Sequence, residues 1–432
     1  MTSVPRWVEV HRLAVAGREA RIARDVGSAV ARVWLARSRF ADVAGLAQLT
    51  LTLGEDADAL YDLGWAKRAT GFPADSLAAY GRALSLFQDD QDRGNEAATL
   101  NNIGNVYDGL GDRQQALDHY ERALPITREV GNRTGEATTL NNIGMVHNGL
   151  GDRQRALAYY EQALPILREV GDRAGEATTL NNIGSVHNGL GDRQRALAYY
   201  EQALPILREV GDRAGEATTL NNIGMVHNGL GDRQRALAYY EQALPIRREV
   251  GNRAGEATTL NNIGMVHNRL GDQQQAREYY ERALAITREV GNRPGEATTL
   301  NNIGGVHHDL GDGQRALHYY EQALRIMREV GNRAGEATTL NNIGSVHNDL
   351  GDRQQALHFY RQALSTLRQV GDRAREAVTR YNIAMVHRHQ GELDRAVAEL
   401  EQVVELDRQV GHPDLESHAA MLKRVRDELS GR

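Results

Sequence analysis

Residues 136–175 read EATTLNNIGMVHNGLGDRQRALAYYEQALPILREVGDRAG, and residues 176–215 repeat them with a single change, from Met145 to Ser185. The phrase recurs eight times in strict forty-residue register, and a ninth, degenerate copy precedes it from about residue 56. The eight copies open at Glu96, Glu136, Glu176, Glu216, Glu256, Glu296, Glu336 and Glu376. Self-similarity at a fixed period predicts an array of equivalent repeats in place of separate globular domains.

Each repeat carries two amphipathic stripes. Apolar residues at three- and four-residue steps predict a helix A over residues 137–150 and a helix B over residues 156–170. Between them Gly151 can take a left-handed conformation that ends helix A, and Asp152 can cap helix B. Pro165 lies inside helix B, yet other repeats keep the same frame without proline, so we expect a kinked but continuous helix. The residues that replace it are Ala285, Arg325 and Ser365.

The small and large positions of these helices resemble the tetratricopeptide repeat. The matching residues are Leu140, Ile143, Gly144, Ala156, Tyr160 and Ala163. The resemblance implies an all-α fold, a right-handed superhelical α-solenoid, in which small residues let A and B approach closely and stacking buries the core. His147 replaces the family's usual tyrosine, and the forty-residue period, against thirty-four, implies longer helices. The forty-residue repeats resemble those of the Pins-type adaptors, and their TLNN residues resemble the same motif in kinesin light chains. Similar arrays form sensor regions of bacterial signalling ATPases and of caspase-like proteases.

The ends of the chain depart from the repeat. We expect an N-terminal helical cap at residues 1–55, with two helices between residues 28 and 54, and a degenerate repeat at residues 56–95. Eight full repeats follow at residues 96–413. A C-terminal capping helix is expected at residues 414–432, beginning near Asp414. Its inward residues are predicted to be Leu415, Leu422, Val425 and Leu429.

Composition excludes several classes of function. The 432 residues include no cysteine, and the net charge of −6 is spread over a mixed-sign surface without a basic stripe, so nucleic acid is not an expected partner. No apolar stretch approaches about eighteen residues, and the first residues lack a signal pattern, which predicts a cytoplasmic protein without a membrane partner. No phosphate loop, nucleophile or metal cluster stands out from the repeat. We therefore expect no enzyme activity, no cofactor and no metal.

One face of helix A is the candidate binding site. Opposite Leu140 and His147 it carries Thr138, Asn142, Met145 and Gly149, and the resemblance turns this face toward a concave groove. The Asn142 column, meaning the equivalent residue of every full repeat, is Asn102, Asn142, Asn182, Asn222, Asn262, Asn302, Asn342 and Asn382. A carboxamide can pair with both the N–H and the C=O of an extended peptide. The alternative is that Asn142 only hydrogen-bonds neighbouring helices, which is the role we expect for the flanking Asn141.

The same face varies between repeats. Its varied candidates are Met145, Met225 and Met265 at one position and Arg269, Asp309 and Asp349 at another. This variation indicates that different repeats recognise different ligand groups. Drift is the alternative, since the Leu167 column, which we place on the outward side of helix B, varies too. The columns that flank Asn142 are not basic, so a neutral or mixed peptide fits better than the acidic tail of a chaperone.

The histidines at position 147 and its equivalents form a regular column. Helices pack about 8–10 Å apart, whereas zinc ligands must each reach the ion at about 2 Å, so the column cannot converge on one metal. We expect each histidine to fill the slot of the family tyrosine with one nitrogen bonded locally. A cumulative sensitivity to pH stays open as an alternative.

These observations predict a non-catalytic scaffold that binds an extended peptide segment of another protein in its groove. A second hypothesis is a regulatory sensor array of a bacterial signalling or defence system that acts with a separate ATPase or protease. A third is self-association of the repeats end to end.

Overall fold

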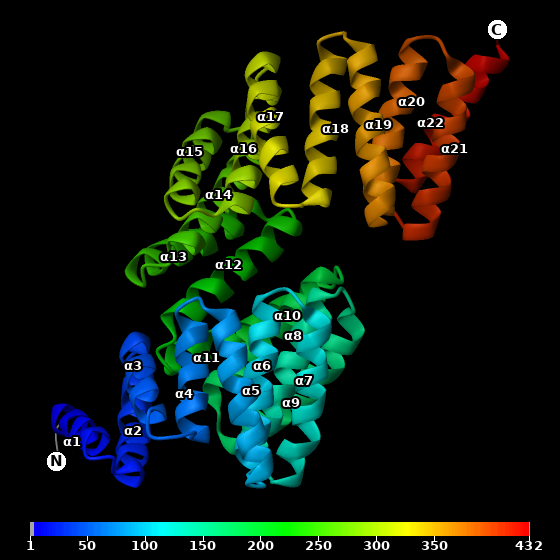
Figure 1. Ribbon diagram of the computed structural model, residues 1–432. Coiled ribbons are helices and arrows are strands. Elements are labelled where there is room, and N and C mark those ends of the chain that lie inside the picture. Colours follow the sequence, from blue (N-terminus) through cyan, green and yellow to red (C-terminus); the bar gives the residue numbers. More distant parts are fainter. Residues whose placement is uncertain (1–3, 432) are drawn as a thin grey trace. The chain divides into compact units, whose positions relative to one another are not determined.

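The computed structural model describes residues 4–431, so residues 1–3 and 432 of the two expected caps lie outside the described chain. The described residues form twenty-two helices and no strand, in successive antiparallel pairs that are plain to see in α18–α21 (Figure 1). The predicted all-α class is confirmed. The chain divides into two compact units, residues 1–212 and 213–432. Within residues 4–431 no helix is both long enough and apolar enough to cross a membrane.

The N-terminal unit contains the first eleven helices. Their bounds are α1 Val4–Ala16, α2 Ala20–Leu35, α3 Phe40–Leu51, α4 Ala57–Ala69, α5 Pro73–Asp89, α6 Arg93–Gly109, α7 Arg113–Glu129, α8 Arg133–Gly149, α9 Arg153–Val170, α10 Arg173–Gly189 and α11 Arg193–Glu209. The even-numbered helices from α4 are A helices and the odd-numbered ones from α5 are B helices.

The C-terminal unit contains the other eleven helices, in which α12 to α20 continue as A helices and α13 to α21 as B helices. Their bounds are α12 Arg213–Gly229, α13 Arg233–Glu249, α14 Arg253–Leu270, α15 Gln273–Glu289, α16 Arg293–Asp309, α17 Gly313–Glu329, α18 Arg333–Asp349, α19 Arg353–Val370, α20 Arg373–His389, α21 Leu393–Val410 and α22 Leu415–Ser430.

Local sequence sets the helix ends as predicted. Gly151 has φ +85°, a left-handed conformation that stops α8, and the Asp152 carboxylate accepts a hydrogen bond from the Arg155 backbone N–H at 3.2 Å. Helix α9 runs unbroken through Pro165, so the predicted continuity is confirmed. The glycine and the aspartate of the repeat therefore determine the turn between its two helices.

A missing side chain brings each A helix onto its B helix. A Cβ atom on Gly144 would lie 2.7 Å from Cε1 of the buried Tyr160, so only glycine leaves room for the ring. Ala156 and Ala163 are fully buried. The predicted close approach of the two helices is confirmed, and stacking of successive pairs hides the apolar stripes.

Ion pairs join successive repeats in a way that sequence analysis missed. The buried Glu136 accepts hydrogen bonds from Arg128 of the preceding B helix at 2.8 Å and from Arg133 at 2.5 Å, and Arg133 also reaches Glu169 at 2.9 Å. We call this four-residue arrangement the junction network. It recurs around Glu176, Glu256 and Glu296. The glutamate that opens each repeat is thus a structural clamp between repeats.

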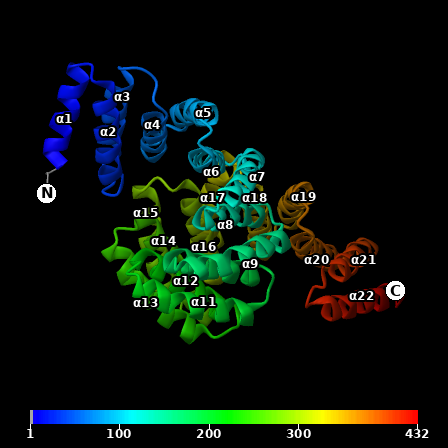
Figure 2. The ribbon, with the colours of Figure 1, turned by 90° about the horizontal axis from the view of Figure 1, so that it is seen from below.

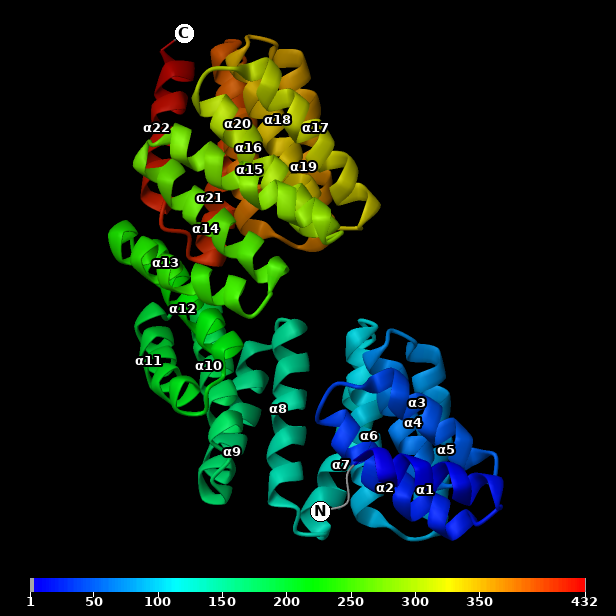
Figure 3. The ribbon, with the colours of Figure 1, turned by 90° about the vertical axis from the view of Figure 1, so that its left-hand side faces the viewer.

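Helices outside the repeat register lie at both ends of the described chain. The two helices expected between residues 28 and 54 are α2 and α3, although α2 begins earlier, at Ala20, and α1 precedes them (Figure 3). At the C-terminus α22 lies beside α21 and buries Leu422 and Val425, as predicted (Figure 2). His418 Nδ1 of α22 lies 2.7 Å from the fully buried Asp407 carboxylate of α21, which adds a polar tie to the apolar contact.

Candidate functional site

The Asn142 column lies half-buried on the A helices, and its amide groups are partly committed to the fold. Nδ2 of Asn262 donates to Oδ1 of Asn221 on the preceding A helix at 3.1 Å. The same bond joins Asn342 to Asn301 and Asn382 to Asn341, at 3.2 and 3.1 Å. Within residues 4–431 no other hydrogen bond engages Asn262, so its Oδ1 and its second N–H are left for a ligand. The alternative hypothesis, that the column only bonds neighbouring helices, therefore explains the role of Nδ2 in these residues but not that of Oδ1.

Other members of the column differ. Asn102 donates to the Tyr61 hydroxyl at 2.7 Å, and Asn142 lies 3.4 Å from Oδ1 of Asn105. The carboxamides of Asn182 and Asn302 make no hydrogen bond to any residue of the described chain. Asn222 is half-buried at the equivalent place on α12. The carboxamides of Asn182 and Asn302 are therefore fully available on this face.

The flanking Asn141 column binds neighbouring A helices, as predicted. Nδ2 of Asn141 donates to the Thr179 hydroxyl at 2.8 Å, and Asn261 donates to Thr299 at 2.7 Å. Together the two asparagine columns form a polar ladder from one A helix to the next. We refer to the surface carrying the Thr138, Asn142, Met145 and Gly149 columns as the groove face.

The varied candidates lie at the C-terminal part of the A helices. Met145 and Met225 are exposed, whereas Met265 packs partly against the core around α15–α17. The three charged candidates are exposed, and each contacts the preceding A helix: Arg269 Nη1 to Asn228 Oδ1 at 3.4 Å, Asp309 Oδ2 to Asn268 Nδ2 at 3.3 Å, and Asp349 Oδ2 to His308 Nε2 at 2.8 Å.

The Leu167 column is not outward, and its placement from sequence was wrong. Leu167 is 1% exposed, and its equivalents Thr287, Met327 and Leu367 are buried as well. The side chains of Leu167, Thr287 and Met327 reach the glycine in the first turn of the next A helix; a Cβ on Gly175, for example, would lie 2.7 Å from Leu167 Cδ2. A B helix contacts two A helices, its own and the next, so a second stripe of its surface is covered. The variation in this column is therefore variation beneath the groove face.

Residues of this column line depressions whose lining also includes residues of the groove face. A depression of about 320 Å³ in the N-terminal unit and one of about 290 Å³ in the C-terminal unit occupy equivalent places. In the first, Tyr61, Trp65, Asn102 and Asn105 add an aromatic and amide wall. The shared lining is Ala98, Asn101, Thr127, Asn132, Thr134, Gly135 and Thr138 in one and Thr298, Asn301, Met327, Asn332, Ala334, Gly335 and Thr338 in the other. The mixed lining suits ligand side chains more than a large apolar molecule.

The next repeat modifies the depression. Arg375 stands where most full repeats have glycine, and it borders both the 290 Å³ depression and a neighbouring one of about 180 Å³ that Leu367 also lines. Val378 replaces the usual threonine on its wall and is exposed. The repeats of the C-terminal unit therefore offer chemically different walls around the same kind of depression.

The histidine column is packed within each repeat. The ring of His147 stacks on Tyr159 of the following B helix, with centroids 5.5 Å apart and planes 7° apart, and the His187–Tyr199 pair is nearly the same. His387 Nδ1 lies 2.6 Å from the Glu392 carboxylate. No group of three or more His, Cys, Asp or Glu side chains that could hold a metal ion occurs between residues 4 and 431. The column is part of the packing of A on B.

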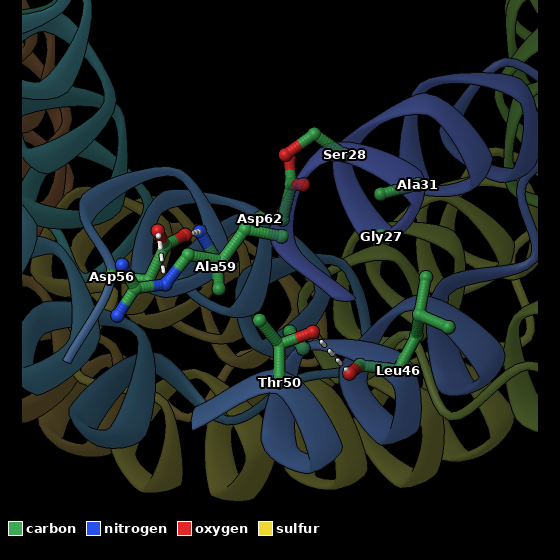
Figure 4. Close-up of a pocket in the computed structure, with 10 residues that line it drawn as sticks. Gly27, Ser28, Ala31, Leu46, Thr50, Asp56, Ala59 and Asp62 are labelled. Atoms are coloured by element: carbon green, nitrogen blue, oxygen red, sulfur yellow. Dashed lines mark hydrogen bonds and ion pairs between the residues drawn. The ribbon is translucent and has the colours of Figure 1, made fainter. Parts of the chain in front are cut away.

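A small cavity separates α2, α3 and α4 near the N-terminus (Figure 4). Its volume of about 10 Å³ is room for no more than one water molecule, so it is not a ligand site. Asp62 is one of the residues that line it. Burial, together with the charges of Asp58 and Asp56, raises the pKa of Asp62 to about 7.

Comparison with known families identifies the architecture. The model of the tetratricopeptide repeat family matches residues 55–129, 135–209, 215–289, 255–329, 295–369 and 335–409. The chain belongs to the tetratricopeptide repeat (TPR) family. Comparison of this TPR protein with curated proteins gives no match.

Solved structures share the fold. The apo form of the quorum sensor NprR from B. thuringiensis has a TM-score of 0.60 and 15% identity, covering 84% of this chain and 97% of NprR. A signal transduction ATPase of the STAND class with a TPR sensor, from Pyrococcus horikoshii, has a TM-score of 0.59 and 14% identity, covering 88% of this chain and 57% of that protein. The apo form of RapI has a TM-score of 0.55 and 17% identity, covering 64% and 99%. At these identities the likeness establishes the fold.

Proposed function

We propose that this TPR protein binds an extended segment of another protein across the groove face of its A helices. The observation that carries the proposal is the set of ligand-accessible carboxamides in the Asn142 column, above all Asn302, which has no hydrogen-bond partner within the described residues. A carboxamide that is held on a rigid helix and is not satisfied by the fold is suited to pair with peptide backbone.

Spacing supports a peptide ligand. Neighbouring A helices lie about 10 Å apart, and an extended chain rises about 3.3 Å per residue, so each repeat covers about three ligand residues. The asparagines would then hold the ligand backbone once per repeat. The depressions at the N-terminal ends of the A helices would receive side chains and supply the selectivity that backbone pairing lacks.

The polar ladder gives the groove face rigidity. Because Nδ2 of Asn342 and Nδ2 of Asn382 are already bound to the preceding A helix, their carbonyl oxygens are fixed in place before a ligand arrives. Fixed acceptors lose less conformational entropy on binding than mobile ones. The partial structural commitment of the column is therefore compatible with recognition.

The test begins with a pull-down from the native host and a peptide array that maps the bound segment. Asn302→Ala is then expected to weaken that segment's affinity about two- to tenfold, since one net hydrogen bond contributes about 0.5–1.5 kcal/mol. Its melting temperature should match that of the wild type. The matched control is Glu321→Ala on the exposed side of α17. Unchanged affinity together with a clearly lowered melting temperature would mean that the column is structural only.

A further inference from the structure

Arg247 is a charged residue in an apolar slot. It lies on α13 in the Leu167 column, where the equivalent residues of other repeats include Leu207, Met327 and Leu367, and it is 8% exposed. Leucine fills the same slot twice in the N-terminal unit, so the fold of a repeat does not require a cation there.

No anion within residues 4–431 neutralises Arg247. Within residues 4–431 no hydrogen bond or ion pair reaches its guanidinium group, and its Nε is fully enclosed without a partner. Burial lowers the pKa of Arg247, yet arginine stays charged at neutral pH because its ordinary pKa lies far above neutrality. By contrast the equally buried Arg380 is paired with Glu376 and Glu399.

The acidic residues of the same junction are already occupied. Glu249 is bound by Arg213, and Glu256 is held by Arg248 at 2.7 Å and by Arg253 at 2.5 Å. A buried guanidinium without a counter-ion is costly, and the cost falls when an anion arrives from outside.

The position of Arg247 places this charge beneath the groove face. By the forty-residue register it corresponds to Thr127 and Met327, which line the two depressions described above together with groove-face threonines. Its side chain lies against Gly255 in the first turn of α14, where an added Cβ would be 2.7 Å from Arg247 Cδ. The positive end of the α14 dipole therefore adds to the field at this point.

We infer that Arg247 is a carboxylate-binding subsite of the groove face. It would take an aspartate or glutamate side chain of the bound segment, or the segment's C-terminal carboxylate. The planar guanidinium matches a carboxylate with two parallel hydrogen bonds. The inference rests on the proposed function, because the bound segment delivers the carboxylate, and it adds one acidic group to the ligand chemistry at α12–α14.

The first arm of the test uses acetate as the probe on the full chain. At constant ionic strength, replacing chloride with acetate is expected to raise the melting temperature of the wild type, because acetate binds only the folded state. Arg247→Leu is expected to melt at a higher temperature than the wild type in chloride and to lose the response to acetate. Arg325→Leu, which removes an exposed arginine of α17, should keep the response. An acetate response that is absent from the wild type, or equal in Arg247→Leu, overturns the inference.

The second arm uses an array of extended peptides in which one position alternates between glutamate and glutamine. Each peptide is made with a free and with an amidated C-terminus, which separates the two sources of carboxylate. Either the glutamate peptide should bind the wild type more tightly than the glutamine peptide, or the peptide with a free C-terminus should bind more tightly than the amidated one. The expected difference in affinity is about tenfold to a hundredfold. Arg247→Leu should abolish this preference and keep the remaining affinity. Binding without a preference that depends on Arg247 overturns the inference and leaves the proposed groove intact. If no peptide binds, the proposed function fails and the acetate arm alone decides the inference.

Discussion

Gly264→Ala is expected to loosen the contact between α14 and α15. The added Cβ would lie 2.8 Å from both Cδ1 and Cε1 of Tyr280 and 3.2 Å from the backbone oxygen of Ala276. Carbon atoms pack best at about 3.5–4.0 Å, so the ring has to move by roughly 1 Å in a core where it is 2% exposed.

The magnitude follows from two opposing terms. Overpacking of this kind costs about 1–3 kcal/mol, and the higher helix propensity of alanine returns about 1 kcal/mol. The net loss is expected to be about 1–2 kcal/mol. Gly264→Leu, with a larger side chain at the same contact, should unfold this part of the array.

The chain contains its own compensated version of this change. In α20 and α21 the equivalent residues are Ala384 and Leu400, both fully buried. A smaller residue on helix B thus accompanies the larger residue on helix A. Tyr280→Leu alone should cost about 2 kcal/mol by leaving a cavity, whereas the double variant Gly264→Ala/Tyr280→Leu should be more stable than the sum of the single changes by about 1–2 kcal/mol.

The assay must resolve one repeat. Repeat arrays open locally, so we would measure hydrogen exchange of peptides from residues 269–290, whose sequence differs from that of every other repeat. Faster exchange in Gly264→Ala and recovery in the double variant are expected. Additivity of the two changes within about 0.5 kcal/mol, or slower exchange in Gly264→Ala, would refute the packing argument.

Two further predictions concern pH. Burial raises the pKa of Glu256, but hydrogen bonds from Arg248 and Arg253 outweigh this effect and leave the pKa below its usual value of 4.5. The junction network therefore stabilises the fold above pH 4.5, and this stabilisation is lost as the pH falls through the lowered pKa. Glu256→Gln should cost about 1–2 kcal/mol at pH 7 and flatten this acid dependence in hydrogen exchange of residues 247–261; an unchanged acid limb would contradict the assignment. The pKa of Asp62 shifts in the opposite direction, because burial and then the charges of Asp58 and Asp56 raise it to about 7. The contribution of Asp62 to stability is therefore complete below about pH 4 and is lost as the pH rises through 7. Asp62→Asn should be more stable than the wild type at pH 8 by about 2 kcal/mol and equal to it at pH 4, measured by tryptophan fluorescence because all three tryptophans lie within the first 65 residues; equal melting at pH 8 would count against a raised pKa.

Much of the candidate site could be predicted from one repeat read as a helix. The wheel placed Thr138 and Asn142 on one face and Asn141 on its flank, and the structure confirms the bond from Asn141 to the next A helix. The sequence could not show that Asn342 donates one N–H to Asn301 whereas Asn302 donates none within residues 4–431. This difference depends on small displacements between neighbouring helices. The peptide-binding role of the column stays a prediction.

The sequence by itself determined the period, the helix pairs and their turns, since these depend on contacts within about one repeat: Gly151 stops a helix, and Gly144 admits Tyr160. Only the tertiary structure decided what becomes of surfaces that a second neighbour covers. The Leu167 column looked outward because a helical wheel shows one buried face, whereas a B helix between two A helices buries two. For the same reason only the structure shows that Glu136 is held between repeats and that Nε of Arg247 is enclosed without a partner among residues 4–431. Burial and pairing across a junction arise from residues of two repeats brought together by stacking.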